Sequence, residues 1–162
     1  MNKIWLKLLI SAVILIIAPT FSSCSGGSDE VETIITENDL PSAAKSFLDT
    51  YFRNIDIQKI EKENDGEIEV FVVNLVNGFE IVFNSAGQWQ EVEAPYNLTV
   101  PSAIIPEPIL QTLDNQYPGY GVIEINTTGQ NYHIVLSNNQ GGASIDLMFN
   151  QSGEIISTGD MD

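Results

Sequence analysis

Five acidic residues alternate through one stretch of the chain, namely Glu61, Glu63, Asp65, Glu67 and Glu69. Clustered carboxylates are the ligands that a hard cation such as Ca²⁺ requires, and two neighbouring carboxylates can also act as general acid and general base. The spacing matches neither a calcium-binding loop nor a glycosidase motif. Because alternate residues of a strand share a face, the pattern predicts a solvated strand face and no metal site.

The single histidine, His133, is the other residue whose type could do chemistry. Alternation places it on the solvent side of a strand, opposite Tyr132 and Ile134, and a lone histidine is a poor metal site and a poor base without a partner. No motif places a Ser-His-Asp set, and no Gly-rich phosphate loop follows a strand. The sequence therefore predicts no catalytic residue and no cofactor, and favours a protein that is not an enzyme.

The single cysteine, Cys24, follows a segment with the three parts of an export signal. Residues 1–23 contain a basic start at Lys3 and Lys7, an apolar run too short to span a bilayer comfortably, and then small residues. The sequence Phe21-Ser22-Ser23-Cys24 resembles the lipobox of bacterial lipoproteins, with Phe21 in place of the usual Leu. That resemblance implies acylation of Cys24, hence a lipid anchor in the cell envelope, in an outer membrane and facing either the periplasm or the surface.

Charge and composition define the segment after the cysteine and the class of partner. Residues 24–38 are small, polar and acidic at the start, which predicts a flexible tether. The formal net charge is −16, and no Lys or Arg follows Lys62. Such a surface repels nucleic acid, because nucleic acid is bound mainly through Lys and Arg. If the charge serves recognition rather than solubility alone, the partner is a basic protein or peptide.

One pattern occurs twice and sets the expected domain organisation. The stretch 78–89 returns as 144–155, where an alternating run ends in Phe-Asn, a Gly follows four residues after the Phe, and a second run begins. Each stretch predicts a strand, a tight turn and a strand. We therefore expect two units, at residues 39–97 and 98–162.

Each unit is predicted to open with a helix. Apolar residues at helical spacing form one stripe from Leu40 to Phe52, with Pro41 in the first turn and Asp39 or Ser42 as the cap. Prolines at 106, 108 and 118 limit the second helix to about residues 107–116. An offset of 66 residues maps four stripe positions onto it: Ala43, Ala44, Phe47 and Tyr51 onto Ile109, Leu110, Leu113 and Tyr117. The same offset aligns His133 with Glu67.

Four strands are expected after each helix. In the first unit the turns fall at 64–66 and 85–87, and Phe79, Ile81 and Phe83 share one face. In the second unit strands are expected near 122–126, 132–137, 144–149 and 154–157. The predicted fold class is α+β, a tandem repeat of a helix plus a four-stranded antiparallel sheet, forming one curved sheet with the helices on one face.

These residues match a family pattern. Leu40-Pro41 opening a helix, Tyr51-Phe52 closing it, and strands ending in Phe-Asn-x-x-Gly with Trp89 after the turn resemble the PepSY-like, β-lactamase-inhibitor-like proteins of Bacteroidota over residues 39–160. The second unit departs from the pattern, with Ile155 in place of Trp. The resemblance implies helices on the convex side of a curved sheet and binding through its concave surface. No inhibitory residue can be transferred, because no contact motif matches.

Three functions remain open at this stage: a lipid-anchored binding or inhibitor module, an envelope accessory protein that binds carbohydrate, and an enzyme with unrecognised chemistry. We favour the first, because each helix can cover only one sheet face and the other face stays available for a partner. The residues expected on that open face are Glu67, Glu69, Phe71, Glu80, Val82, Val92, His133, Val135 and Asp146.

Overall fold

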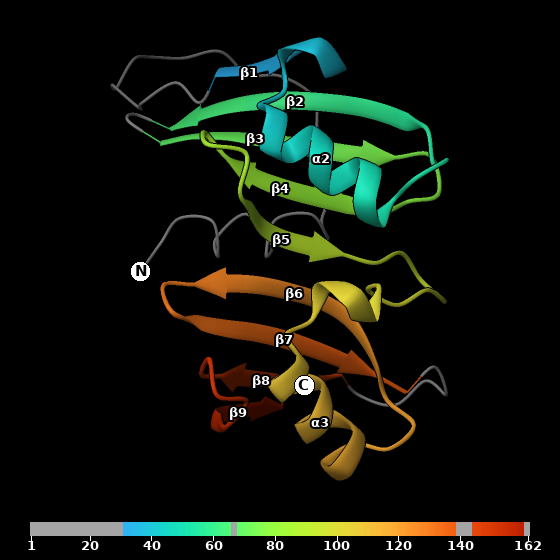
Figure 1. Cartoon of the computed structure of the whole chain (residues 1–162), viewed down its shortest axis with the longest axis vertical. Coiled ribbons are helices and arrows are strands. Elements are labelled where there is room, and N and C mark those ends of the chain that lie inside the picture. The colour runs from blue at the N-terminus through green and yellow to red at the C-terminus, as the bar shows by residue number, and fades with distance from the viewer. Residues whose placement is uncertain (1–30, 66–67, 139–143, 161–162) are drawn as a thin grey trace, which may run out of the picture.

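The computed structural model describes residues 31–65, 68–138 and 144–160. Its strands form one antiparallel sheet of nine strands in the order β1 to β9, so each strand pairs with its neighbours in the sequence (Figure 1). The strands are β1 (Val31–Ile34), β2 (Ile57–Asp65), β3 (Ile68–Leu75), β4 (Glu80–Asn84), β5 (Trp89–Glu93), β6 (Gly121–Thr128), β7 (Asn131–Ser137), β8 (Ile145–Phe149) and β9 (Ile155–Asp160).

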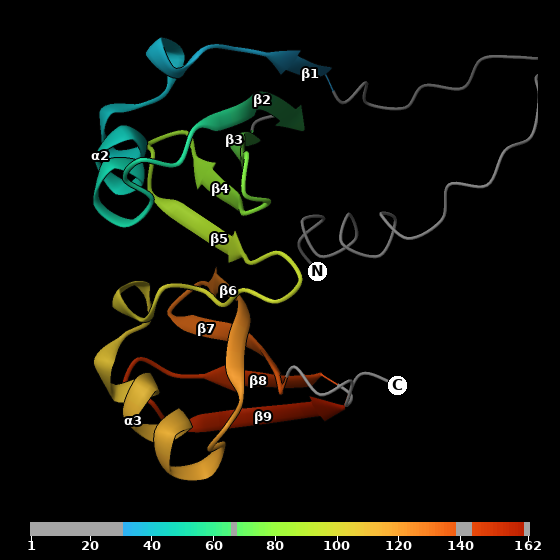
Figure 2. The same cartoon turned by 90° about the vertical axis from the view of Figure 1, so that its right-hand side faces the viewer.

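Two helices, α2 (Ser42–Tyr51) and α3 (Glu107–Gln116), accompany the sheet, together with two short 3₁₀ helices, η1 (Glu37–Asp39) and η2 (Ser102–Ile104). Both α-helices lie on the same side of the sheet, α2 over the strands of the first half and α3 over those of the second (Figures 1 and 2). The expected α+β class, the antiparallel sheet and the placement of the helices on one face are therefore confirmed.

The core lies between the helices and the sheet. Strand register aligns one row of apolar side chains from β2 to β8 on the helix side, because residues paired directly across strands share a face. This row consists of Ile60, Val73, Ile81, Val92, Ile125, Ile134 and Leu147. All seven are buried, so one core runs through both halves of the molecule.

The helix stripe is confirmed, although the start of the first helix differs from the expectation. Leu40, Ala44, Leu48 and Phe52 are buried against the sheet. Pro41 is the N-cap of α2, with extended backbone angles, rather than a residue of its first turn. Asp39 instead accepts hydrogen bonds from the N–H and the hydroxyl of Thr36, so its carboxylate caps η1 and is not available to α2.

Each helix is followed by four strands, but the two halves do not align with a constant offset. Ala44 and Leu48 are the buried positions of α2, and Ile109 and Leu113 are those of α3, which is an offset of 65 in the numbering. The mapping of Ala43 onto Ile109 was therefore wrong by one residue. Different loop lengths change the offset again within the sheet, so that constant-offset alignment fails outside the repeated turn.

The repeated Phe-Asn-x-x-Gly pattern has the same structure in both halves. The side-chain oxygen of Asn84 accepts the N–H groups of Ala86 and Gln88, and that of Asn150 accepts the N–H groups of Ser152 and Glu154. Gly87 and Gly153 have positive φ values of 78° and 81°. A Cβ atom on Gly87 would lie 2.7 Å from Pro41 Cβ, and one on Gly153 would lie 2.4 Å from the Pro108 carbonyl oxygen. The turn needs glycine for its conformation and for its close contact with the helix start.

The expected tether is partly structured. Within the segment 24–38, residues Val31–Ile34 pair with β2 as an edge strand, and the segment ends in the first residues of η1 (Glu37–Asp39). The correction follows from Ile35, which packs against the core and ties this segment to the domain. Cys24, the expected export signal and Glu67 lie outside the described residues. Within the described ranges, no helix is both long and apolar enough to cross a bilayer.

Candidate binding surface on the sheet

The sheet face opposite the helices, here called the uncovered face, carries two rows of side chains that alternate with the core row. The first row runs from β3 to β8 and consists of Val72, Val82, Glu91, Asn126, His133 and Met148. The second row consists of Asn74, Glu80, Glu93, Glu124, Val135 and Asp146. Half of these twelve positions are ionisable, which contrasts with the aliphatic row on the other side of the same strands.

Five residues expected on the open face lie there, namely Glu80, Val82, His133, Val135 and Asp146. Val135, however, is only 3% exposed, so it belongs to the buried part of that face and is not an accessible contact. His133 pairs with Met148 in the second half as Val72 pairs with Val82 in the first. The position equivalent to His133 is therefore Val72, and the expected alignment of His133 with Glu67 was wrong.

Three of the expected residues lie on the opposite side. Phe71 pairs with Phe83 and is 4% exposed within the core, and Val92 is in the core row. Glu69 shares the face of Phe71, where its carboxylate is 2.6 Å from Lys62 Nζ. The centre of β3 is apolar on both faces, so alternation alone could not show which side Phe71 takes; the pairing with Phe83 decides it.

Glu61 and Glu69, two members of the acidic run, lie on opposite faces of the sheet and do not form one site. Glu61 forms an ion pair with Lys59 on the uncovered face, whereas Glu69 pairs with Lys62 on the helix side. The Lys62 ammonium also lies 5.8 Å from the centre of the Phe71 ring. Within the part of the chain that the structure describes, no three His, Cys, Asp or Glu side chains are placed to hold a metal ion.

His133 is buried in a chain of hydrogen bonds across β6, β7 and β8. Its Nε2 lies 2.6 Å from Asp146 Oδ1, and its Nδ1 lies 3.1 Å from Asn126 Nδ2, which also donates to Glu124 Oε1 at 3.1 Å. Because the Asn126 amide is a donor, Nδ1 accepts and Nε2 carries the proton. Both ring nitrogens are engaged, so this histidine holds the surface together and has no free nitrogen to act as a base.

A glutamate cluster at the junction of the two halves was not predicted. Glu91 and Glu93 on β5 pair across the junction with Asn126 and Glu124 on β6, and Glu80 on β4 pairs with Glu93 from the other side. No local pattern predicts this cluster, because β5 and β6 are separated by η2 and α3 and only their pairing brings the acids together. We call Glu80, Glu91, Glu93 and Glu124 the junction glutamates.

Burial and mutual repulsion raise the pKa values of these carboxyl groups. Desolvation, followed by the charges of Glu124, Glu93 and Glu80, raises the pKa of Glu91 to about 8. Desolvation is also the main cause of the raised pKa values of Glu80, Glu93 and Glu124. The nearby His133 and the hydrogen bond from the Asn126 amide act in the opposite direction and lower the pKa of Glu124. Negative charge on the junction glutamates is therefore poorly solvated, and Glu91 holds its proton at neutral pH.

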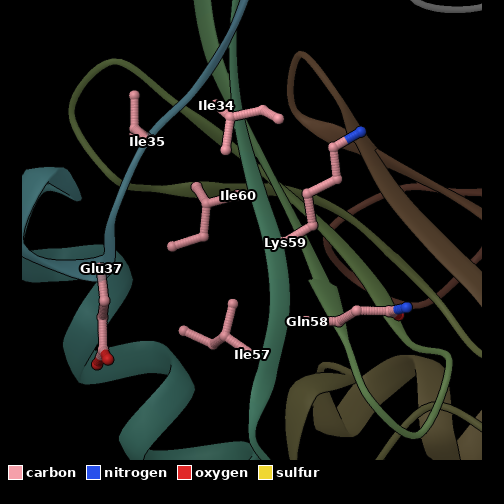
Figure 3. Close-up of a pocket in the computed structure, with 7 residues that line it drawn as sticks. All are labelled: Ile34, Ile35, Glu37, Ile57, Gln58, Lys59 and Ile60. Atoms are coloured by element: carbon pink, nitrogen blue, oxygen red, sulfur yellow. The ribbon is translucent and has the colours of Figure 1, made fainter.

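Two recesses lie beside β2. One, of about 500 Å³, is on the uncovered face and is lined by Gln58, Lys59, Glu61, Asn74 and Glu80. The other, of about 440 Å³, lies between β2 and the segment that follows β1, with Ile35, Ile57 and Ile60 on one side of β2 and Gln58 and Lys59 pointing away (Figure 3). Three of its isoleucines, Ile35, Ile57 and Ile60, already pack against the core.

A protein-family model described as "Putative beta-lactamase-inhibitor-like, PepSY-like" matches residues 69–157. The chain belongs to the PepSY-like family. This confirms the resemblance inferred from the helix starts and the Phe-Asn-x-x-Gly turns. No curated protein matches the chain.

Solved structures of Bacteroides proteins share the fold of this PepSY-like chain. A Bacteroides thetaiotaomicron protein described as "a putative calcium-regulated periplasmic protein" is 26% identical, with a TM-score of 0.72 over 79% of this chain and 96% of its own. Two Bacteroides vulgatus proteins, both described as periplasmic and one as a member of the DUF2874 family, are 25% and 27% identical. Both have TM-scores of 0.72, over 83% and 80% of this chain and 99% and 100% of their own.

Proposed function

We propose that this PepSY-like chain is an extracytoplasmic binding module that receives a basic protein or peptide on the uncovered face of its sheet. The periplasmic proteins among its structural neighbours support the compartment. The observation that carries the proposal is the charge of this face: the junction glutamates form no ion pair with a Lys or Arg among the described residues, and the chain contains no Lys or Arg after Lys62. A basic partner would supply the missing counter-charge.

The arrangement of aromatic side chains favours this function over carbohydrate binding. Sugar-binding surfaces use exposed aromatic rings as stacking platforms, whereas the two rows of the uncovered face contain no Phe, Tyr or Trp. The rings of the sheet lie on the helix side, where Trp89 stacks on Tyr132 at 6.5 Å and Phe47 contacts Phe83. A face whose strands present charges and no rings suits a protein or peptide better than a sugar.

Several finer features belong to the same proposal. The two helix-plus-four-strand halves are copies of one unit, joined edge to edge into a curved sheet whose concave side is the uncovered face. The module is anchored to the envelope through an acylated Cys24. It acts without chemistry of its own, by occupying the surface of a partner, which includes inhibition if that partner is an enzyme. The identical Asn-centred turns at Asn84 and Asn150 support the common unit.

The anchor and the face are tested separately in cells that produce the protein. A Cys24→Ala variant should incorporate no clickable fatty acid, and equal labelling of both proteins would contradict anchoring. For the face, affinity-tagged protein is cross-linked in the native envelope and its partners are identified. Val82→Lys on the uncovered face should abolish recovery of the basic partner, whereas Thr50→Lys on the exposed side of α2 should not. Recovery by both variants would place the interface elsewhere.

A further inference from the structure

Glu91 is the buried carboxyl of the uncovered face that lacks a partner. The residue is only 5% exposed, and no donor in the described ranges forms a hydrogen bond or ion pair with its carboxylate. Among the described residues, no side-chain oxygen is both fully sealed from solvent and without a partner, so the Glu91 oxygens still reach the surface. A buried carboxylate without a partner has lost its contact with water and gained no counter-charge. A positively charged hydrogen-bond donor from a partner would supply that counter-charge.

The groups facing Glu91 are almost all acidic. On its own strand Glu93 follows two residues later, and across the neighbouring strands lie Glu80 on β4 and Glu124 on β6. Asn126 is paired directly with Glu91 and spends its amide donors on Glu124 and His133. His133 in turn contacts Asp146, so the one other ionisable donor nearby is already engaged. Lys59 lines the recess beside Glu80 but forms its ion pair with Glu61, so within the described ranges no ion pair joins a lysine or arginine to the junction glutamates.

We propose that the junction glutamates bind one cationic side chain, the ammonium of a lysine or the guanidinium of an arginine, presented by a protein partner. This assignment rests on the proposed function and names the group that the face recognises. Its acceptors stand on three adjacent strands that lie about 4.8 Å apart, and no three of them are placed to hold a metal ion. A long side chain arriving end-on brings three to five N–H donors, which can reach separate acceptors.

An apolar rim adjoins the junction glutamates. Strand β3 ends, β4 begins and β5 ends at the same margin of the sheet, and the loops there expose Val76, Leu98 and Tyr96, the last 92% exposed. Gly78 in one loop lies against Pro95 in the other. The connection after β5 swings out on the side away from the helices (Figure 2). An exposed ring beside an acidic pocket suits the aliphatic stem of a lysine or arginine and its apolar neighbours.

Binding of a cation at this site must be coupled to release of a proton. Without a partner, the Glu91 carboxyl holds its proton up to about pH 8 because of burial and the charges of Glu124, Glu93 and Glu80. A lysine ammonium remains charged in this range, since its ordinary pKa is about 10.4. Affinity should therefore rise from pH 6 to pH 8 and then level off, as the proton on Glu91 ceases to compete.

The test uses the purified protein and a capped pentapeptide with one central lysine among alanines, titrated by NMR at pH 8. Its controls are the same peptide with norleucine, which keeps the stem and lacks the charge, and CaCl₂ alone. The lysine peptide should shift the Glu91 carboxyl resonance and bind at least about tenfold more weakly to Glu91→Gln, because a charged hydrogen-bond acceptor is lost. Glu37→Gln, which removes an equal charge from exposed η1, should bind as the wild type does.

Each remaining outcome overturns the assignment. Equal binding of the norleucine peptide would show an apolar site, unchanged binding by Glu91→Gln would place the cation elsewhere, and no binding of the lysine peptide would rule out the pocket. Binding of Ca²⁺ in preference to the lysine peptide would identify a metal site instead. These failures are distinguishable from failure of the proposed function, because Val82→Lys would still abolish partner recovery if the face binds by other contacts.

Discussion

The two faces of the sheet are built from the same strands but differ in the polarity of their side chains. On the helix side, register aligns aliphatic residues into one continuous row under α2 and α3. On the uncovered side, the intervening positions carry carboxylates, an engaged histidine and only a few valines. The neighbouring residues Glu91 and Val92 on β5 are both buried, but Val92 packs in the core on the helix side and Glu91 lies among other acids on the uncovered face. The helix side is optimised for stability, and the uncovered side retains unfavourable electrostatics that a partner would relieve.

The largest expected effect comes from the helix side. Phe149→Ala removes a fully buried ring and should lower the free energy of unfolding by about 3 to 5 kcal/mol. Met148→Ala, the adjacent position on the uncovered face, is half-buried and should cost about 1 kcal/mol. Urea denaturation of both variants measures the difference, and similar losses would mean that the faces do not differ in this way.

The contact between turn and helix start is tested by two glycines of positive φ. Gly153→Ala should cost roughly 2 to 3 kcal/mol, because the new Cβ adds a clash with the Pro108 carbonyl to an unfavourable backbone conformation. Gly129→Ala has a similar φ but no atom within 4 Å, so it should cost only about 1 kcal/mol. Equal losses measured by thermal unfolding would show that the close approach contributes nothing.

The electrostatic cost of the uncovered face should appear as a pH dependence. The pKa of Glu91 is raised from 4.5 to about 8, so the folded state binds this proton more tightly than the unfolded state. The resulting stability is complete below pH 4.5 and is lost as the pH rises through 8. Glu91→Gln should thus be more stable than the wild type at pH 9, by roughly 2 kcal/mol, and similar to it at pH 4.

The matched control is Glu93→Gln, an exposed glutamate on the same strand and face. Its gain at pH 9 should be smaller, since Glu93 is more exposed than Glu91 and solvent screens part of its charge. Thermal midpoints of the three proteins across pH 4 to 9 provide the measurement. A midpoint difference between Glu91→Gln and the wild type that does not vary with pH would show that Glu91 ionises normally.

The smallest expected effect concerns Val82. Because this valine is half-buried on the uncovered face, Val82→Lys should change the free energy of unfolding by about 1 kcal/mol or less, while abolishing recovery of the partner. The equivalent change at Val135 would be strongly destabilising, since that residue is buried. If Val82→Lys unfolds the protein, this part of the face belongs to the core and cannot be an interface.

Local patterns were sufficient to predict most of the architecture. The apolar stripe from Leu40 to Phe52, the alternating strands and the two Phe-Asn-x-x-Gly turns each depend on neighbouring residues, and each was correct in type and position. The early strand β1 was missed because its four residues carry little periodic signal. The predicted alignment of the second helix with the first was wrong by one residue, because a constant offset in the numbering cannot account for loops of different lengths.

The candidate site was less predictable because it depends on pairing between distant segments. Alternation correctly placed Glu80 and His133 on the same face, yet it put Phe71 on the wrong side, where only pairing with Phe83 reveals its position. The junction glutamates depend on β5 meeting β6 across the connection that contains α3. Nothing in the local sequence around Glu91 distinguishes it from any other glutamate on a strand.

The strictly sequential strand order has a consequence for how the protein forms. Each strand pairs with the strand just before it, and only the β1–β2 and β5–β6 pairings span long connections, which contain α2 and α3. Little loop-closure entropy is lost at the other steps, so such a chain has low contact order and is expected to fold rapidly. The first half can assemble before the second is available, and β5 then presents a free edge on which β6 to β9 add in turn.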